Sequence, residues 1–420
     1  MTPTSLSPPA ASAGSGADFD LVVIGASYAG VGIVAAAREA GFAGRIALVG
    51  DEAELPYQRP PLSKGFLLGT SAAILPLKGE PFYREAQIDL IAGRRALALD
   101  RQSRRVRLDD GSELGFGTLA LTTGARAAAL RCPGAELEGV LSLRSHDDAL
   151  RLSERLGAAS ALVIIGGGFI GLEVAAAAIK LGKQVTVIEA GPRLIGHAVA
   201  PEISAFIHSV HVGQGVAIRL ATKVERIEGE GGRVIAVICE DGTRLPCDLV
   251  LAAVGAVPNT ELAMAAGLSV VDGIVVDEFC RTSDPAIFAA GDCTSHPNPF
   301  AGRQMRLSSV QNAHDQGRVV GHAVAGKVEP YRAVPWFWSD QYDVKLQMVG
   351  LANGSGPAVL RGSPEEGRFS LFRYEGERLA AIESIGRPAD HMMGRRLITA
   401  GISPSPQQAA DPAFDLRSLA

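Results

Sequence analysis

The stretch Ala161-Leu-Val-Ile-Ile-Gly-Gly-Gly-Phe-Ile-Gly171 decides the fold predicted for this chain. A short β-branched run leads into a glycine-rich turn, and a helical apolar pattern then continues to Leu181. The chain returns to strand character at Gln184-Val-Thr-Val-Ile188, and acidic Glu189 follows directly. Glycines let a pyrophosphate approach the backbone at a helix N-terminus, and an acid after the second strand accepts hydrogen bonds from ribose hydroxyls. The stretch therefore predicts a βαβ unit that holds a dinucleotide.

A second copy of this pattern lies earlier in the sequence. The strand Asp20-Leu-Val-Val-Ile24 precedes the turn Gly25-Ala-Ser-Tyr-Ala-Gly30, and Arg45-Ile-Ala-Leu-Val49 follows, with Asp51 two residues beyond it. Ser27 replaces the middle glycine, so this copy taken alone also fits a helix packed on a strand without a ligand. Together the two copies predict an α/β fold with two Rossmann-like domains and two dinucleotides.

Length, charge and cysteine content narrow the function classes. With 420 residues the chain has room for about three domains. Its formal charge of −5 gives no general attraction for nucleic acid or anionic lipid. The five cysteines form no Cys-x-x-Cys pair, so neither an iron–sulfur cage nor a dithiol motif is predicted, and the thiols are expected in the core.

Two uncharged stretches, Leu21 to Ala37 and Leu156 to Leu172, approach the roughly 18 residues of a membrane helix. Glycines interrupt both, which favours strand, turn and helix in water and predicts a soluble, cytoplasmic protein. Met1 to Ala17 has no charged side chain and lacks the basic start and apolar run of a signal peptide, so we expect a disordered tail.

Three further motifs carry a family resemblance. They are Leu55-Pro-Tyr-Gln-Arg-Pro-Pro-Leu-Ser-Lys64, Ile287-Phe-Ala-Ala-Gly-Asp-Cys293 and Pro335-Trp-Phe-Trp-Ser-Asp-Gln-Tyr342. Over about residues 19 to 400 the chain resembles the putidaredoxin reductase family. The resemblance implies a ferredoxin reductase in which NADH passes a hydride to FAD, and single electrons then go to a [2Fe-2S] ferredoxin. That ferredoxin would serve a cytochrome P-450 monooxygenase or a Rieske dioxygenase.

The resemblance also implies how the chain is divided. The family has a glutathione-reductase-like FAD/NAD fold with a smaller α+β C-terminal domain. We expect a tail at residues 1–17, an FAD-binding domain at 18–118 and 251–328, an NAD-binding domain at 119–250, and the C-terminal domain at 329–420. In that last domain the pattern predicts a hairpin over residues 369–385 and a short helix over 391–399.

The resemblance assigns contacts to FAD residue by residue. They are Gly25, Ser27, Ala29, Gly30, Asp51, Lys64, Ala96, Thr123, Gly124, Arg144, Asp292 and Val310. Asp51 would lie at the adenosine ribose and Asp292 at a ribityl hydroxyl, although Asp292 also fits simple capping of the next segment. Val310 would open a helix whose positive end faces the flavin, or is a plain core valine. Arg144 is alternatively a surface arginine at the start of a helix.

Contacts to NAD are assigned in the same way. They are Gly166, Gly168, Ile170, Gly171, Glu189 and Gly255. The Glu189 carboxylate can accept a hydrogen bond from a ribose 2'-hydroxyl and would repel a 2'-phosphate, which favours NADH over NADPH. Arg193 lies nearby in the sequence and leaves NADPH open.

Lys64 and Glu173 are the predicted catalytic residues. The resemblance places the Lys64 ammonium beside flavin N5, after two prolines that stiffen the loop, with Glu173 as its carboxylate partner. The lysine would stabilise added electron density on N5 and help to orient the nicotinamide. Taken singly, each residue would usually be solvent-exposed.

Several other residues have two interpretations or none. Trp336 and Trp338 fit aromatic core packing or, by the resemblance, a path between the flavin and a ferredoxin-facing surface. His208 and His211 are three apart with no further ligand nearby, so we assign no metal and expect a surface helix. The family commonly has a glutamate where this chain has Ser308, and no effect of that change is predicted.

Rival functions remain at this point. A disulfide reductase or peroxidase of related fold needs a cysteine beside the flavin, and residues 19–100 contain none. A rubredoxin or nitrite-type NADH reductase stays open, as do a quinone or oxygen reductase and an NADH-sensing flavoprotein similar to apoptosis-inducing factor. The last of these would suit the fold, but no basic run for DNA is found.

Overall fold

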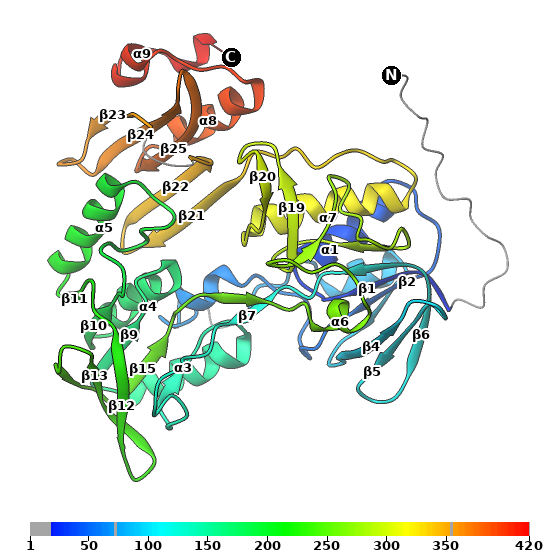
Figure 1. Ribbon diagram of the computed structural model, residues 1–420, viewed down its shortest axis with the longest axis horizontal. Coiled ribbons are helices and arrows are strands. Elements are labelled where there is room, and N and C mark those ends of the chain that lie inside the picture. The colour runs from blue at the N-terminus through cyan, green and yellow to red at the C-terminus, as the bar shows by residue number, and fades with distance from the viewer. Residues whose placement is uncertain (1–17, 71–73, 353–355, 420) are drawn as a thin grey trace. The chain divides into compact units, whose positions relative to one another are not determined.

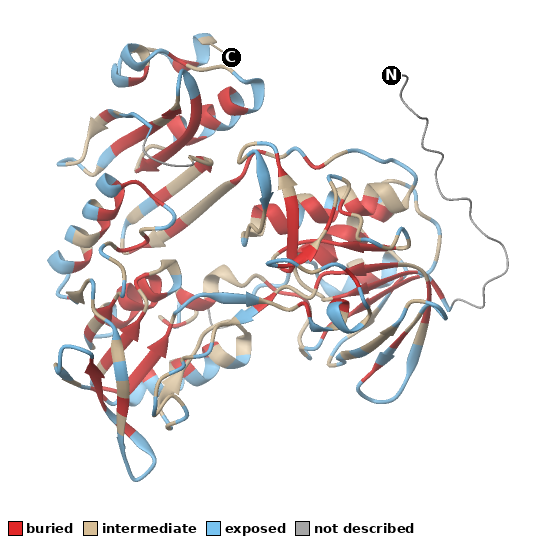
Figure 2. Cartoon of the chain, viewed as in Figure 1, coloured by how far each residue is buried: buried red, intermediate tan, exposed pale blue. Residues whose placement is uncertain are grey.

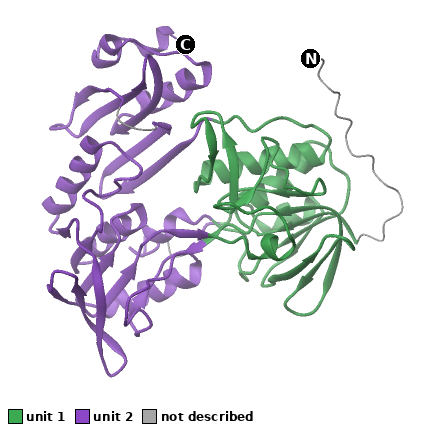
Figure 3. Ribbon diagram, in the orientation of Figure 1, with its two compact units in different colours: residues 1–57, 76–125, 258–333 green, residues 58–75, 126–257, 334–420 purple. Residues whose placement is uncertain are grey.

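A computed structural model describes residues 18–70, 74–352 and 356–419 of the chain (Figure 1). The predicted tail at Met1 to Ala17 lies outside these residues. Two compact units divide the chain (Figure 3). Unit 1 holds the residues up to Tyr57, Pro76–Ala125 and Pro258–Ala333, and unit 2 holds Gln58–Leu75, Arg126–Val257 and the residues from Val334.

Unit 1 is built on a seven-stranded sheet in the order β3-β2-β1-β6-β5-β4, with β18 also paired to β6. Its strands are β1 (Phe19–Ile24), β2 (Ile46–Val49), β3 (Ile88–Ile91), β4 (Ala96–Asp100), β5 (Arg105–Leu108), β6 (Glu113–Leu121) and β18 (Ile287–Ala289). β1 lies at the centre between parallel neighbours, with Leu21 opposite Ile46 and Val22 opposite Leu119. Leu21, Val22 and Val23 are fully buried. Figure 2 marks the buried residues of the chain in red.

Helices α1 (Tyr28–Glu39) and α7 (Val310–Val324) pack closely against one another in unit 1. Glycines permit the close approach, because a Cβ on Gly317 would lie 2.6 Å from the Ala29 carbonyl oxygen. A Cβ on Gly321 would likewise lie 2.5 Å from the Ile33 carbonyl oxygen. Unit 1 also contains α2 (Glu80–Glu85), α6 (Glu261–Ala265), β17 (Ile274–Val275), β19 (Thr294–Asn298) and β20 (Arg303–Met305).

Unit 2 contains a five-stranded parallel sheet in the order β11-β10-β9-β15-β8. The strands are β8 (Val140–Leu141), β9 (Ala161–Ile165), β10 (Gln184–Ile188), β11 (Ala217–Arg219) and β15 (Leu249–Ala252). The helices of this part are α3 (His146–Ala158), α4 (Phe169–Lys180) and α5 (Pro201–Gly213). An antiparallel insert follows, made of β12 (Val224–Glu230), β13 (Arg233–Cys239) and β14 (Arg244–Pro246). Both predicted βαβ units are therefore present, one in each unit.

The chain ends in an antiparallel sheet of order β21-β22-β25-β24-β23. Its elements are β21 (Trp336–Gln341), β22 (Val344–Gly350), β23 (Ala358–Ser363), β24 (Arg368–Glu375), β25 (Arg378–Ile385), α8 (Pro388–Ala400) and α9 (Pro406–Ala410). This sheet shares a hydrophobic core with the five-stranded parallel sheet of unit 2 and its helices. Phe206 on α5 meets Phe369 on β24 edge to face at 5.2 Å, and Glu383 accepts a hydrogen bond from Ala200 N at 2.8 Å. The predicted domain boundaries remain predictions beside this two-unit division.

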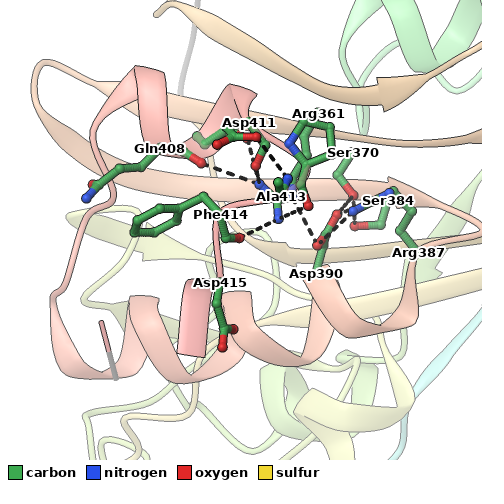
Figure 4. Close-up of polar contacts among 12 residues, drawn as sticks. Arg361, Ser370, Ser384, Arg387, Asp390, Gln408, Asp411, Ala413, Phe414 and Asp415 are labelled. Carbon is green, nitrogen blue, oxygen red and sulfur yellow. Dashed lines mark hydrogen bonds and ion pairs between the residues drawn. The ribbon is translucent and has the colours of Figure 1, made fainter. Parts of the chain in front are cut away.

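A buried arginine ties the last residues of the chain to this sheet (Figure 4). Arg361 on β23 is 4% exposed and donates hydrogen bonds to the carbonyl oxygens of Ala409, Asp411 and Phe414. Its Nε lies 3.4 Å from Asp390 Oδ1 on α8. One side chain thus holds α8, α9 and the segment after α9 together.

The remaining short elements are η1 (Pro60–Ser63), η2 (Leu416–Leu419), β7 (Ala125–Ala127) and β16 (Ala256–Pro258). Across the part of the chain that the structure describes, no helix has both the length and the apolar character needed to cross a membrane.

Candidate active site

The first glycine turn connects β1 to α1 in unit 1. Gly25 has a φ of +119°, and a Cβ at this position would lie 2.0 Å from the Thr122 carbonyl oxygen. A Cβ on Gly30 would lie 2.0 Å from the Gly25 carbonyl oxygen. Only glycine therefore fits either position. The tight turn brings the N-cap Ser27 and the first residues of α1, Ala29 among them, to the carboxyl end of the parallel strands.

The second glycine turn connects β9 to α4 in unit 2 with the same geometry. Gly166 has a φ of +110°, and a Cβ here would lie 2.3 Å from the Ala253 carbonyl oxygen. A Cβ on Gly171 would lie 2.3 Å from the Gly166 carbonyl oxygen. A Cβ on Gly168, by contrast, would meet no atom within 4 Å. Gly168 thus faces open space, which a phosphate can approach.

The helices after the two turns begin without a capping side chain. The N-cap residues of α1 and α4 are Ser27 and Gly168, and neither helix has a side-chain capping hydrogen bond. In contrast, the side chains of Ser145 and Ser309 cap α3 and α7. An uncapped helix N-terminus leaves backbone N–H groups for an anion. The two turns therefore fit the pyrophosphate groups of two dinucleotides.

The two acids predicted to contact ribose differ in how they are held. Glu189 follows β10, and its carboxylate accepts hydrogen bonds from Gly167 N and Gly191 N, both at 2.7 Å. Arg193 donates instead to backbone carbonyls of its own loop, those of Val199 and Gly196. Asp51 is exposed and pairs with Arg95 at 3.2 Å. Glu189 is therefore fixed beside the glycine turn, while the Asp51 side chain lies in solvent.

Other predicted FAD contacts lie in unit 1 at the ends of its elements. Asp292 follows β18 and Gly291, whose N–H donates to Gln316 Oε1 at 2.7 Å. Thr123 follows β6 and donates to the Asn259 carbonyl oxygen at 2.6 Å. Val310 is the first residue of α7 and is half-buried.

The predicted residues divide between the two units. Unit 1 holds Gly25, Ser27, Ala29, Gly30, Asp51, Ala96, Thr123, Gly124, Asp292 and Val310. Unit 2 holds Lys64, Arg144, Gly166, Gly168, Ile170, Gly171, Glu173, Glu189 and Gly255. The roles of Lys64 and Arg144 toward FAD therefore remain predictions.

Lys64 and Glu173 form an ion pair within unit 2. Lys64 follows the short helix η1, and its Nζ lies 2.6 Å from Glu173 Oε2 on α4. The Glu173 side chain is only 4% exposed and that of Lys64 22%, so neither is a freely solvated surface residue. Ser63 Oγ donates to the same carboxylate oxygen at 2.5 Å. The helix that opens with the second glycine turn thus also holds a fixed, partly covered ammonium group.

Sequence reasoning missed Ser339, which donates to Glu173 Oε1 at 2.7 Å. It lies in the Pro-Trp-Phe-Trp-Ser motif, in which the sequence predicted roles only for the two tryptophans. Trp336 and Trp338 are half-exposed on β21 with ring centroids 5.5 Å apart, so they are not core residues. The Arg395 guanidinium lies 5.0 Å from the Trp336 ring centre.

The predicted surface position of His211 is wrong. His211 is 0% exposed, because this face of α5 packs against the C-terminal sheet, and its Nε2 lies 2.8 Å from Gln341 Oε1. Burial lowers the pKa of its imidazole. His208 is half-buried on the same helix.

The cysteines lie mostly in the core, as predicted. Cys239, Cys247, Cys280 and Cys293 are buried and Cys132 is partly buried, and each is a free thiol. Burial raises the pKa of Cys247 to about 12, which keeps this thiol protonated near neutral pH.

Two glycine turns that each fit a pyrophosphate, on two βαβ units of one chain, define a two-dinucleotide oxidoreductase. The pyridine nucleotide-disulphide oxidoreductase family matches residues 19–317, and the reductase C-terminal family matches residues 336–420. This chain belongs to the pyridine nucleotide-disulphide oxidoreductase family. The predicted fold class is confirmed.

Several relatives are similar over almost the whole chain. Rhodocoxin reductase of Rhodococcus erythropolis is 44% identical over 400 residues, which is 95% of this chain and 94% of that protein. The crystal structure of the ferredoxin reductase for the CYP199A2 system of Rhodopseudomonas palustris matches with a TM-score of 0.93 at 45% identity, covering 96% and 100% of the two chains. The covalent complex of putidaredoxin reductase with putidaredoxin matches with a TM-score of 0.92 at 39% identity, covering 96% and 98%. The resemblance to putidaredoxin reductase is thereby confirmed.

Proposed function

We propose that this chain is an FAD-containing, NADH-dependent ferredoxin reductase. The overall reaction takes one NADH and two oxidised [2Fe-2S] ferredoxins to NAD⁺, a proton and two reduced ferredoxins. The observation that carries the proposal is the ion pair that Lys64, just after η1, forms with Glu173 on α4, the helix that follows the second glycine turn. Relatives named as reductases of small electron carriers, similar over nearly the full chain, support the same reaction.

The residues that would hold the two nucleotides follow from the turns. The Gly25 to Gly30 turn and Asp292 in unit 1 would hold FAD, and the Gly166 to Gly171 turn in unit 2 would hold NADH. Bound FAD supplies the chemistry that accepts two electrons together and releases them singly. The protein contributes binding, orientation and electrostatics.

Glu189 selects the nicotinamide nucleotide. Its carboxylate is held by two backbone N–H groups at 2.7 Å and lies directly after β10, where a ribose binds in this fold. Because the acid cannot swing away, a 2'-phosphate would meet a fixed negative charge. The guanidinium of Arg193 donates to its own loop rather than toward Glu189. These contacts support NADH as the electron donor.

Lys64 supplies a fixed positive charge. Its ammonium is held by Glu173 Oε2 at 2.6 Å and by the Pro60 carbonyl oxygen at 3.3 Å. A preorganised charge stabilises negative charge that develops beside it without reorganisation during the reaction. Lys64 would therefore lower the barrier for electron density arriving next to it, while Glu173 keeps it in place.

The electron acceptor is a separate protein in this proposal, because the cysteines of the sequence include no Cys-x-x-Cys pair for a cluster. The ferredoxin in turn would serve a monooxygenase or dioxygenase. The proposal also locates the protein in the cytoplasm, which fractionation of the producing cells tests.

The experiment is a comparison of acceptors for the purified, FAD-loaded protein with saturating NADH. We expect a [2Fe-2S] ferredoxin to give the highest kcat/KM among ferredoxin, rubredoxin, nitrite, a quinone and oxygen. A rubredoxin or a quinone that outperforms every ferredoxin offered would assign the chain to the corresponding reductase instead. A higher kcat/KM with nitrite than with every ferredoxin would assign the chain to the nitrite-type NADH reductases.

A further inference from the structure

A path of buried hydrogen bonds leads away from the Lys64–Glu173 pair within unit 2. Ser339 Oγ donates to Glu173 Oε1 at 2.7 Å, and Gln341 Nε2 donates to Ser339 Oγ at 3.1 Å. Gln341 Oε1 lies 2.8 Å from His211 Nε2. Ser339 and His211 are 0% exposed and Gln341 is 1% exposed. Side chains from α4, β21 and α5 are thus linked into one buried path that ends at the carboxylate.

Only one direction of donation satisfies every bond of this path. An ionised carboxylate only accepts, so Ser339 must give its proton to Glu173. The Ser339 oxygen then accepts from the Gln341 amide nitrogen, which turns the amide oxygen of Gln341 toward His211. An amide oxygen also only accepts, so the hydrogen of the His211 ring lies on Nε2. The free Nδ1 lies 3.3 Å from the Tyr342 hydroxyl and can accept its proton.

We propose that Ser339, Gln341 and His211 are positioning residues that hold the Glu173 carboxylate in the orientation that pairs with Lys64. This inference rests on the proposed function only where it takes Lys64 to assist the reaction. The burial of His211 favours the neutral ring that the directed path requires. Every donor along the path contributes to keeping the Glu173 side chain in one rotamer.

The two oxygens of Glu173 show why Ser339 is needed. Oε2 accepts from Ser63 at 2.5 Å and pairs with Lys64 at 2.6 Å. Ser339 is the donor to Oε1 among the contacts of the described chain. Without this hydroxyl, a buried carboxylate oxygen loses its hydrogen bond, which favours rotation of the carboxylate to another orientation. That rotation releases the Lys64 ammonium.

The test measures the accessibility of the Lys64 amine in the FAD-loaded protein by acetylation and mass spectrometry. Loss of a buried hydrogen bond to a charged group is expected to raise the labelling rate of Lys64 about tenfold in Ser339→Ala and Gln341→Leu. Ser339→Thr keeps the hydroxyl and is expected to restore slow labelling. Ser370→Ala is the matched control, because Ser370 is equally buried in the same unit but bonds to Ser384 and Asp390.

A measurement on the unaltered protein covers the case in which a variant does not fold. Nitrogen NMR of ¹⁵N-histidine-labelled protein is expected to show His211 with its proton on Nε2. A proton on Nδ1 instead would break the directed path and overturn the proposal. Lys64 labelling that stays slow in both folded variants would overturn it as well.

The same variants separate this inference from the proposed function. Faster Lys64 labelling together with slower NADH-driven bleaching of the flavin supports both. Faster labelling with an unchanged bleaching rate supports the positioning role and contradicts the part proposed for Lys64 in the reaction.

Discussion

Glu189 Oε2 accepts a hydrogen bond from Gly167 N at 2.7 Å, so the acid after β10 is fastened to the glycine turn that precedes α4. The sequence separates these two residues by a whole helix, and the parallel sheet brings them together. One rigid element of unit 2 therefore contains both the carboxylate that would bind the ribose and the backbone that would hold the pyrophosphate.

Glu189→Gln keeps a hydrogen-bond acceptor but removes the fixed charge. We expect kcat/KM for NADPH to rise about tenfold and that for NADH to fall by a similar factor, since a charged hydrogen bond is replaced by a neutral one. The measurement is the ratio of the two kcat/KM values. Glu154→Gln, an exposed acid on α3, is the control and should leave the ratio unchanged. An unaltered ratio in Glu189→Gln would assign selectivity to another residue.

Gly168→Ala is expected to separate binding from folding. A Cβ here meets no atom of the chain within 4 Å, so the free energy of unfolding should change by less than about 1 kcal/mol. The methyl group would stand where a pyrophosphate approaches, and the Kd for NAD⁺ should rise about tenfold. Titration of the FAD-loaded protein with NAD⁺ measures this, with Gly157→Ala on α3, which also faces open space, as control. Equal Kd values in the two variants would place the nucleotide elsewhere.

Arg361→Met should loosen the end of the chain. The substitution leaves Asp390 without one of its cationic partners and five backbone carbonyls of residues 408–414 without this donor. It is expected to lower the free energy of unfolding by about 3–5 kcal/mol. Urea unfolding gives the change, and hydrogen exchange should rise first at residues 408–414. Arg396→Met, an exposed arginine on α8, should change neither. Protection of 408–414 that survives in Arg361→Met would contradict the anchor.

Two buried histidines should make the protein less stable in mild acid. Burial lowers the pKa of both His296 and His391 to about 4, from 6.5 in the unfolded chain. Between pH 4 and pH 6.5 the histidines take up protons in the unfolded chain but not in the folded one. Their contribution to the free energy of unfolding is therefore fully present above pH 6.5 and is lost as the pH falls toward 4. At pH 5 the loss is about 2 kcal/mol for each histidine. Urea unfolding at pH 7.5 and pH 5 measures the loss. The difference in the free energy of unfolding between the two pH values should be smaller in His296→Gln. An identical difference in that variant would show that His296 does not contribute to the acid sensitivity.

The two βαβ units were predictable because local sequence encodes them. Gly25 and Gly166 must adopt positive φ against a neighbouring strand, and few other sequences produce that turn. The pairing of Lys64 with Glu173 came from the family resemblance, and the structure shows the two side chains in contact.

Contacts between distant segments were beyond the sequence pattern. His211 carries no local sign of burial, because the face of α5 that holds it is covered by β21, some 130 residues later. Ser339 likewise gives no signal by itself, since only the packing of β21 beside α4 brings its hydroxyl to Glu173. The carbonyl groups that surround Arg361 lie on a chain end without a recognisable motif.

The central claim is that NADH held by this chain reduces an FAD held by the same chain, with Lys64 as the assisting charge. Stopped-flow mixing of the FAD-loaded protein with NADH, without oxygen, measures it through the bleaching of the flavin absorbance. We expect rapid bleaching in the unaltered protein and in Lys180→Met, an exposed lysine at the end of α4, and bleaching about 10–100 times slower in Lys64→Met. A flavin that NADH does not bleach, or a Lys64→Met variant as fast as the unaltered protein, would contradict the account.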